Sequence, residues 1–193
     1  MKNRWNGKNA MWMLLYTVLY AVVTALVCVT GSIHPIFFVC YQITAGILLS
    51  GIIIRAFGRI QAPGVAACLA LGVILLLLAI GDAVAWHVIP LVMIAVLAEV
   101  IRAISRDHWA GEVAAAVIMS FSTFGYYGQI WFHRAYTYEC ALEEMPAGYG
   151  DALMALSPVW VLPVVLIIGV AVSVLIAEVT AKLFQIEQGR GVF

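Results

Sequence analysis

Three of the four histidines of this chain lie near the ends of apolar segments, and their type suggests ligand or metal binding. His34, His87 and His133 stand on three different segments. Imidazole nitrogens bind transition metals and metal chelates such as haem, so histidines that converge would form such a site. A histidine at a membrane interface also needs no ligand to explain it. We therefore keep metal binding by these three residues as an alternative hypothesis.

A second group of polar and aromatic residues continues the segment that ends at His133. Tyr126, Tyr127 and Gln129 lie inside the apolar run, and a Gln there needs hydrogen-bond partners, so it should face the bundle interior or a cavity. Arg134 could hold an anionic ligand group through paired hydrogen bonds, or pair with an acid such as Glu139. Some of the aromatic residues also fit an interfacial belt. The candidate substrate-binding residues are His34, His87, Tyr126, Tyr127, Gln129, Trp131, His133, Arg134, Tyr138 and Trp160.

The sequence contains no motif of a familiar catalytic class. There is no zinc-protease H-E-x-x-H, no G-x-S-x-G and no phosphate-binding P-loop. The four cysteines lack metal-ligand spacing, and three of them lie in apolar runs, so we interpret them as packing residues without a disulfide. We expect that the chain is not an enzyme, holds no cofactor of its own and does not hydrolyse ATP.

The composition determines which elements must position these residues. Hydrophobic residues make up 65% of the 193 residues and charged residues only 10%, against about 25% charged in soluble domains. The sequence therefore predicts an all-α integral membrane protein. Because a spanning helix needs about 20 apolar residues, we predict a six-transmembrane-helix bundle, a single domain over residues 1–193. The predicted spans are 11–30, 35–54, 63–81, 84–104, 109–132 and 156–184. A loop connects the last two spans. Pro158 and Pro163 mark either a turn before the last span or a kink in it.

The placement of Lys and Arg predicts the orientation of the bundle. With six spans, nine of the ten basic residues fall on one side and Arg134 alone falls on the other. The basic side of a membrane protein is the cytoplasmic one. Both termini are then cytoplasmic, and the outer loops lie near 31–34, 81–83 and 135–152. The basic residues on the inner side are Lys2, Arg4, Lys8, Arg55, Arg59, Arg102, Arg106, Lys182 and Arg190.

Charged residues inside the spans gather near the inner side. Glu99 and Arg102 are three residues apart, which favours a local ion pair that reaches toward the interface. Glu112 and the pair Glu178 and Lys182 lie at the same level. We interpret these charges as structural, with a coupling role at the inner face as the alternative.

The chain resembles the substrate-binding S components of energy-coupling factor (ECF) transporters, specifically the Trep_Strep group, also called the MptD family. The similarity covers nearly the whole chain, by length, six-span layout and local pattern. It is carried by the Gly31-Ser32-Ile33-His34-Pro35 loop, by Gly125, Trp131, Arg134 and Tyr138, and by the run from Met145 to Leu153 followed by Pro158 and Trp160.

This resemblance implies a capture subunit in a bacterial cytoplasmic membrane. It would bind a small micronutrient from outside, such as a vitamin, a precursor, a metal or a metal chelate such as haem. Its partners would be a transmembrane coupling protein and a pair of ATPases, with no role for nucleic acid. Docking would use an Ala-x-x-x-Ala face of the first helix, matched here by Ala21 and Ala25.

Two other function classes remain open from the residues alone. One is a small intramembrane enzyme or assembly factor that uses the outer histidines and Glu99. Glu99 lies well below those histidines in the predicted topology, which counts against it. The other is a stand-alone secondary transporter, which usually carries inverted repeats that we do not find here.

Overall fold

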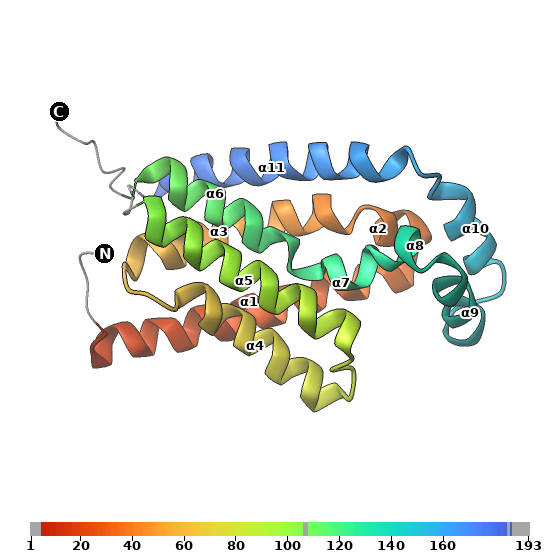
Figure 1. Ribbon diagram of the computed structural model, residues 1–193, viewed down its shortest axis with the longest axis horizontal. Coiled ribbons are helices and arrows are strands. Elements are labelled where there is room, and N and C mark those ends of the chain that lie inside the picture. Colours follow the sequence, from red (N-terminus) through yellow and green to blue (C-terminus); the bar gives the residue numbers. More distant parts are fainter. Residues whose placement is uncertain (1–4, 106–107, 185, 187–193) are drawn as a thin grey trace.

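The apolar runs of the chain form helices that lie side by side along one direction in the computed structural model (Figure 1). The structure describes residues 5–105, 108–184 and 186. Lys2, Arg4, Arg106 and Arg190, which entered the orientation prediction, lie outside them. The helices are α1 (Gly7–Ile33), α2 (Pro35–Val39), α3 (Tyr41–Arg59), α4 (Val65–Ile80), α5 (Ala85–Ser105), α6 (Trp109–Met119), η1 (Ser120–Thr123), α7 (Phe124–Tyr127), α8 (Gln129–Phe132), α9 (Arg134–Glu144), α10 (Tyr149–Leu156) and α11 (Val161–Leu183).

Four of these helices, α1, α3, α5 and α11, are long and apolar enough to cross a membrane, and α4 is a shorter apolar helix. Their outward faces carry large apolar side chains: Met93 on α5 is 66% exposed and Ile167 on α11 is 69% exposed. Apolar faces of this extent are costly in water and suit a lipid environment. The all-α membrane architecture expected from the sequence is therefore present.

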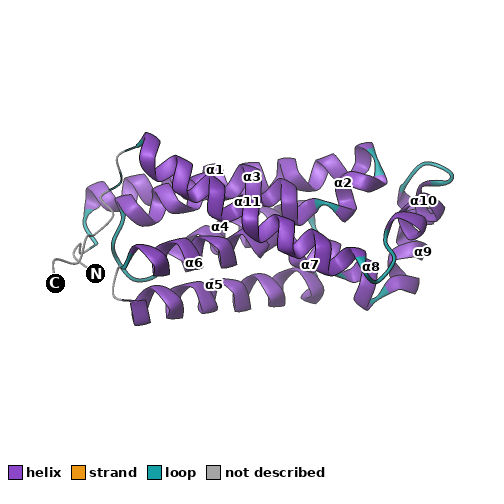
Figure 2. Cartoon of the chain, turned by 90° about the horizontal axis from the view of Figure 1, so that it is seen from above, coloured by secondary structure: helices purple, strands orange, loops and turns teal. Residues whose placement is uncertain are grey.

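Two expectations about residues 109–160 were wrong. The predicted span 109–132 is not one continuous helix, because the polar stretch Ser120–Thr123 forms a 3₁₀ turn between α6 and α7, and α8 follows separately. The predicted loop after it forms two helices, α9 and α10, which lie at one end of the bundle (Figure 2). Pro158 and Pro163 mark a turn before α11 and its first helical turn, which supports the turn alternative.

Small residues bring α3 and α11 into close contact. A Cβ added at Gly46 would meet the Ser173 hydroxyl at 2.7 Å and the Gly169 carbonyl at 3.0 Å. Beside this contact, the buried side chain of Gln42 donates to Ser120 at 3.1 Å and accepts from the Tyr127 hydroxyl at 2.8 Å. Close backbone approach with buried hydrogen bonds is how helices associate in lipid.

The end of the bundle where α1 begins and α11 ends, here called the terminal end, contains a buried ion-pair network. The predicted pair of Glu99 and Arg102 is confirmed, at 3.6 Å. The expectation that it reaches toward the interface was wrong for Arg102, which is fully buried and also contacts Glu112 at 3.1 Å. The Glu99 carboxylate accepts hydrogen bonds from the amides of Gly64 and Ala66. It therefore caps the amino terminus of α4.

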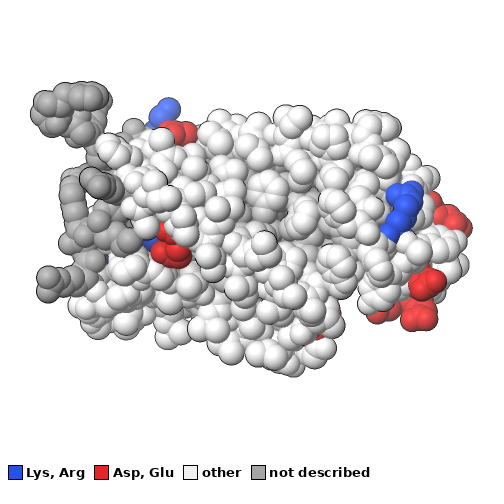
Figure 3. Space-filling view, viewed as in Figure 1, with Lys and Arg blue, Asp and Glu red and all other residues white. Residues whose placement is uncertain are grey.

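Charged side chains lie at the two ends of the molecule and leave the middle apolar on the face shown in Figure 3. At the terminal end, Arg55 and Arg59 stack on the rings of Phe184 and Trp12. The opposite end is here called the α9 end. Among the described residues, Arg134 is the single Lys or Arg at this end. The charges of the described residues therefore gather at the two ends of the helix bundle, and the orientation in a membrane stays a prediction.

Candidate functional site

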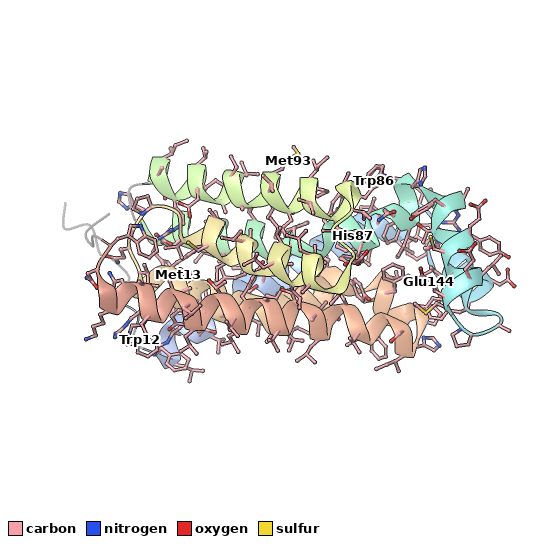
Figure 4. All side chains as sticks on the ribbon, turned by 90° about the horizontal axis from the view of Figure 1, so that it is seen from below. Trp12, Met13, Trp86, His87, Met93 and Glu144 are labelled. Carbon is pink, nitrogen blue, oxygen red and sulfur yellow. The ribbon has the colours of Figure 1, made fainter. Side chains whose placement is uncertain are left out.

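A cavity of about 460 Å³ opens at the α9 end of the bundle. Ligand pockets commonly measure 300–1,000 Å³, so the cavity has room for a vitamin-sized molecule. Its walls come from α1, α2, α3, the turn after α4, α5, α7, α8, α9 and α10. Figure 4 shows His87 on α5 and Glu144 on α9 at this end.

One wall holds a hydrogen-bonded cluster of Asp82, His87 and Tyr126. The Tyr126 hydroxyl donates to one carboxylate oxygen of Asp82, and the other oxygen lies 3.3 Å from Nδ1 of His87. The rings of His87 and Tyr126 stack with centroids 3.7 Å apart. Gln129 lies 3.4 Å from Nε2 of His87 and donates to the carbonyl of Gly125. Polar groups from the turn after α4 and from α5, α7 and α8 therefore share one surface.

Two glycines allow this cluster to form. Gly81 ends α4 with a φ of +78°, a left-handed conformation that glycine adopts at low cost. The chain can therefore turn at once and present Asp82. Gly125 lets α7 pack against the start of α5, because an added Cβ there would overlap the carbonyl oxygen of Trp86 and meet Cα of His87 at 2.9 Å. The stack of His87 on Tyr126 depends on this approach.

Helix α9 forms the opposite wall with Tyr136, Thr137, Cys140 and Glu144. A hydrogen bond with the Cys140 thiol raises the pKa of Tyr136. Tyr149, which also lines the cavity, donates to the carbonyl of Gly31 at 2.5 Å, and burial raises its pKa. Both phenols therefore stay neutral at physiological pH and contribute no negative charge.

The formal charges that line the cavity within the described chain are negative. They are the carboxylates of Asp82 and Glu144, and no Lys or Arg of residues 5–105 and 108–184 lines it. Arg134 lies elsewhere: its guanidinium donates to the carbonyls of Ser157 at 2.8 Å and Met154 at 2.6 Å. It braces the start of α9 against the end of α10, where a cation also suits the helix dipole.

The structure brings together three of the predicted site residues, His87, Tyr126 and Gln129, on the cavity wall. The expectation that Gln129 faces the bundle interior or a cavity is confirmed. Tyr127 instead contributes to the buried network of Gln42. Tyr138 donates to Asp151, a hydrogen bond that raises its pKa.

The remaining predicted residues lie outside the lining of this cavity. Trp131 donates to the carbonyl of Pro158, and Trp160 is exposed. His34 caps α2 by accepting from the amide of Ile36, whereas His133 contacts the rings of Trp86 and Tyr136. The three histidines do not converge, and the described residues contain no group of three His, Cys, Asp or Glu suited to a metal ion.

Six residues line the cavity but were not among the candidate substrate-binding residues: Asp82, Tyr41, Tyr136, Cys140, Glu144 and Tyr149. A signal existed for Asp82, which is the single acid in a short turn between two long apolar runs. For the tyrosines and Cys140 no pattern separates a lining residue from an interfacial or packing one.

A second cavity of about 320 Å³ adjoins the first and shares Asp82, His87 and Tyr126 with it. Its other walls are mostly apolar side chains of α1, α4 and α5. Ala25 lines it, while Ala21 is 7% exposed and packs inside the bundle. The docking role of these two alanines stays a prediction.

Comparison with known families gives a match over most of the chain. Residues 7–185 match the family described as hypothetical bacterial integral membrane protein (Trep_Strep). No curated protein and no solved structure matches the chain. The match covers nearly the whole chain, and its description agrees with the apolar helices of the structure. The chain belongs to the Trep_Strep family of bacterial integral membrane proteins.

Proposed function

We propose that this chain is the substrate-binding S component of an ECF-type importer in the bacterial cytoplasmic membrane. Membership of the Trep_Strep family supports the proposal, together with the resemblance of the chain to S components. In this proposal the chain crosses the membrane six times, with α4 and the broken series α6 to α8 as two of the crossings. Both termini are cytoplasmic and the α9 end faces outward.

The single observation that carries the proposal is the cavity at the α9 end. It lies beside charged and polar helices, opposite the basic terminal end, so its mouth would face the outside when the basic end faces the cytoplasm. A ligand would enter between the Asp82 cluster and α9. The hydrogen bonds of Arg134 fix the start of α9 against the end of α10 and so hold this wall of the cavity in place.

Delivery of the ligand requires energy from partners. The sequence contains no phosphate-binding P-loop that could supply this energy from ATP. A coupling protein and two ATPases would bias a rigid-body movement of the loaded chain, because a conformational change needs a differential free energy. The chain itself performs no catalytic step in this proposal.

The proposal is tested by native mass spectrometry of the detergent-purified protein from cells grown in rich medium. Cys140→Trp places an indole in the cavity, whereas Leu142→Trp adds the same group to the exposed face of α9. We expect a small molecule bound to the wild type and to Leu142→Trp and absent from Cys140→Trp. Absence of any bound compound, or equal retention by both variants, contradicts capture in this cavity.

A further inference from the structure

We infer that the cavity selects an organic cation with an ammonium group or a positively charged ring, and that it disfavours anions. The inference rests on the proposed capture function and adds the chemical class of the ligand. Nothing in the family description assigns a ligand. Charge, aromatic lining and the position of the nearest cation support it separately.

The charge balance of the lining is the first support. Asp82 and Glu144 enter from opposite walls, and no Lys or Arg of the described chain lies between them. The Asp82 carboxylate contacts Tyr126 and His87, yet its side chain is still 39% exposed, so its charge acts on the cavity. Glu144 is exposed and forms no ion pair with any described residue. Two carboxylates and no Lys or Arg of the described chain line the cavity, so the cavity attracts positive charge.

The aromatic lining is the second support. Six aromatic side chains line the cavity: Phe38, Tyr41, Trp86, Tyr126, Tyr136 and Tyr149. The faces of aromatic rings attract cations, and cages of such rings are the usual receptors of quaternary ammonium groups. With neutral phenols at Tyr136 and Tyr149, the rings act through their faces and edges. Carboxylates and aromatic faces together distinguish a cation from a neutral molecule of the same shape.

The position of Arg134 is the third support. A pocket for a carboxylate or phosphate usually presents an Arg or Lys to the ligand. The guanidinium of Arg134 instead donates to Met154 and Ser157 and is absent from the lining. The earlier alternative, that Arg134 anchors an anionic ligand, does not fit this geometry.

A pair of thiol reagents of opposite charge tests the inference without a known ligand. Cys140 lines the cavity, so the other three cysteines are changed to Ala and its rate of modification is measured. The probes are trimethylammonium-ethyl and sulfonatoethyl methanethiosulfonate, a cation and an anion with the same reactive group. The same Cys140 thiolate attacks the sulfenyl sulfur of each reagent and releases methanesulfinate, so the ratio of the two rates cancels the ionisation of the thiol and reports the sign of the local field.

The reference site is Val159→Cys in a Cys140→Ser background, exposed at the same end and outside the cavity lining. We expect the cation-to-anion rate ratio at Cys140 to exceed that at the reference by about tenfold at low salt. Asp82→Asn should reduce the ratio by about threefold, because the amide keeps an acceptor for Tyr126 and loses the charge. Glu144→Gln, an exposed position that folding tolerates, should act likewise.

Asp151→Asn is the matched control. Asp151 also accepts a tyrosine hydroxyl, from Tyr138, and does not line the cavity, so the ratio should stay within error. Equal ratios at Cys140 and the reference, or a ratio unchanged by both Asp82→Asn and Glu144→Gln, would overturn the inference.

The charge of the retained compound gives the second readout. Compounds released by denaturing the wild type and lost from Cys140→Trp are identified by mass spectrometry. A cation supports the inference. A neutral or anionic compound overturns it and leaves the capture function intact. No compound at all counts against both, which separates failure of the ligand class from failure of the proposed function.

Discussion

Replacing Gly125 with alanine tests whether the close approach of α7 to α5 shapes the candidate site. The added methyl would overlap the carbonyl oxygen of Trp86 and lie 2.9 Å from Cα of His87, where ordinary contacts begin at 3.4 Å. Both neighbours are backbone atoms, so no side chain can rotate away. The start of α5 must retreat by at least about 0.5 Å, and overpacking of this kind costs about 1–3 kcal/mol.

The retreat would also separate His87 from Tyr126, whose rings now stack at 3.7 Å. The free energy of unfolding is measured by SDS titration in detergent, and the site is assayed by the amount of bound compound in native mass spectra. We expect Gly125→Ala to lose about 1–3 kcal/mol and most of the bound compound. Gly7→Ala is the control, because a Cβ there meets nothing within 4 Å. Wild-type stability and ligand content in Gly125→Ala would refute the reasoning.

Three further substitutions separate structural residues from binding residues. Arg102→Met should lower the free energy of unfolding by about 3–5 kcal/mol in the same SDS titration, because it removes a fully buried cation that contacts both Glu99 and Glu112. The exposed Arg59→Met should cost below about 1 kcal/mol. Tyr127→Phe should lower the free energy of unfolding by about 1–2 kcal/mol, because the hydrogen bond to Gln42 is lost, and it should leave ligand retention unchanged. Loss of the bound compound in this variant would show that Tyr127 contributes to ligand binding. Arg134→Ala should loosen α9, seen as faster amide hydrogen exchange there, and unchanged exchange would contradict the brace.

Most of the helical architecture follows from hydropathy. The long runs that became α1, α4, α5 and α11 are apolar for nearly their whole length, so their positions were predictable within a few residues. The break at Ser120–Thr123 was not, because its short polar stretch sits inside an otherwise apolar segment. Helix α9 was not predicted because we interpreted its polar composition as that of a loop, although a polar sequence can also form a helix.

The candidate site was predictable only in part, because it depends on contacts between distant segments. His87, Tyr126 and Gln129 were identifiable as polar groups within or next to apolar runs. Asp82 gains its role from Tyr126, 44 residues away in the sequence. Arg134 could not be assigned correctly because its partners are backbone carbonyls, which no side-chain pattern encodes. Its charge suggested either an anionic ligand or an ion pair with an acid such as Glu139, whereas its guanidinium donates to Ser157 and Met154.

The most direct measurement of the central claim is affinity purification of the tagged chain from membranes of a bacterium that encodes it. The membranes are solubilised in mild detergent, and the recovered proteins are quantified against a tagged, unrelated membrane protein. The S-component proposal predicts specific recovery of one multi-span coupling protein together with two ATP-binding-cassette ATPases. Recovery of the chain at high yield without enrichment of any such ATPase would contradict the proposal.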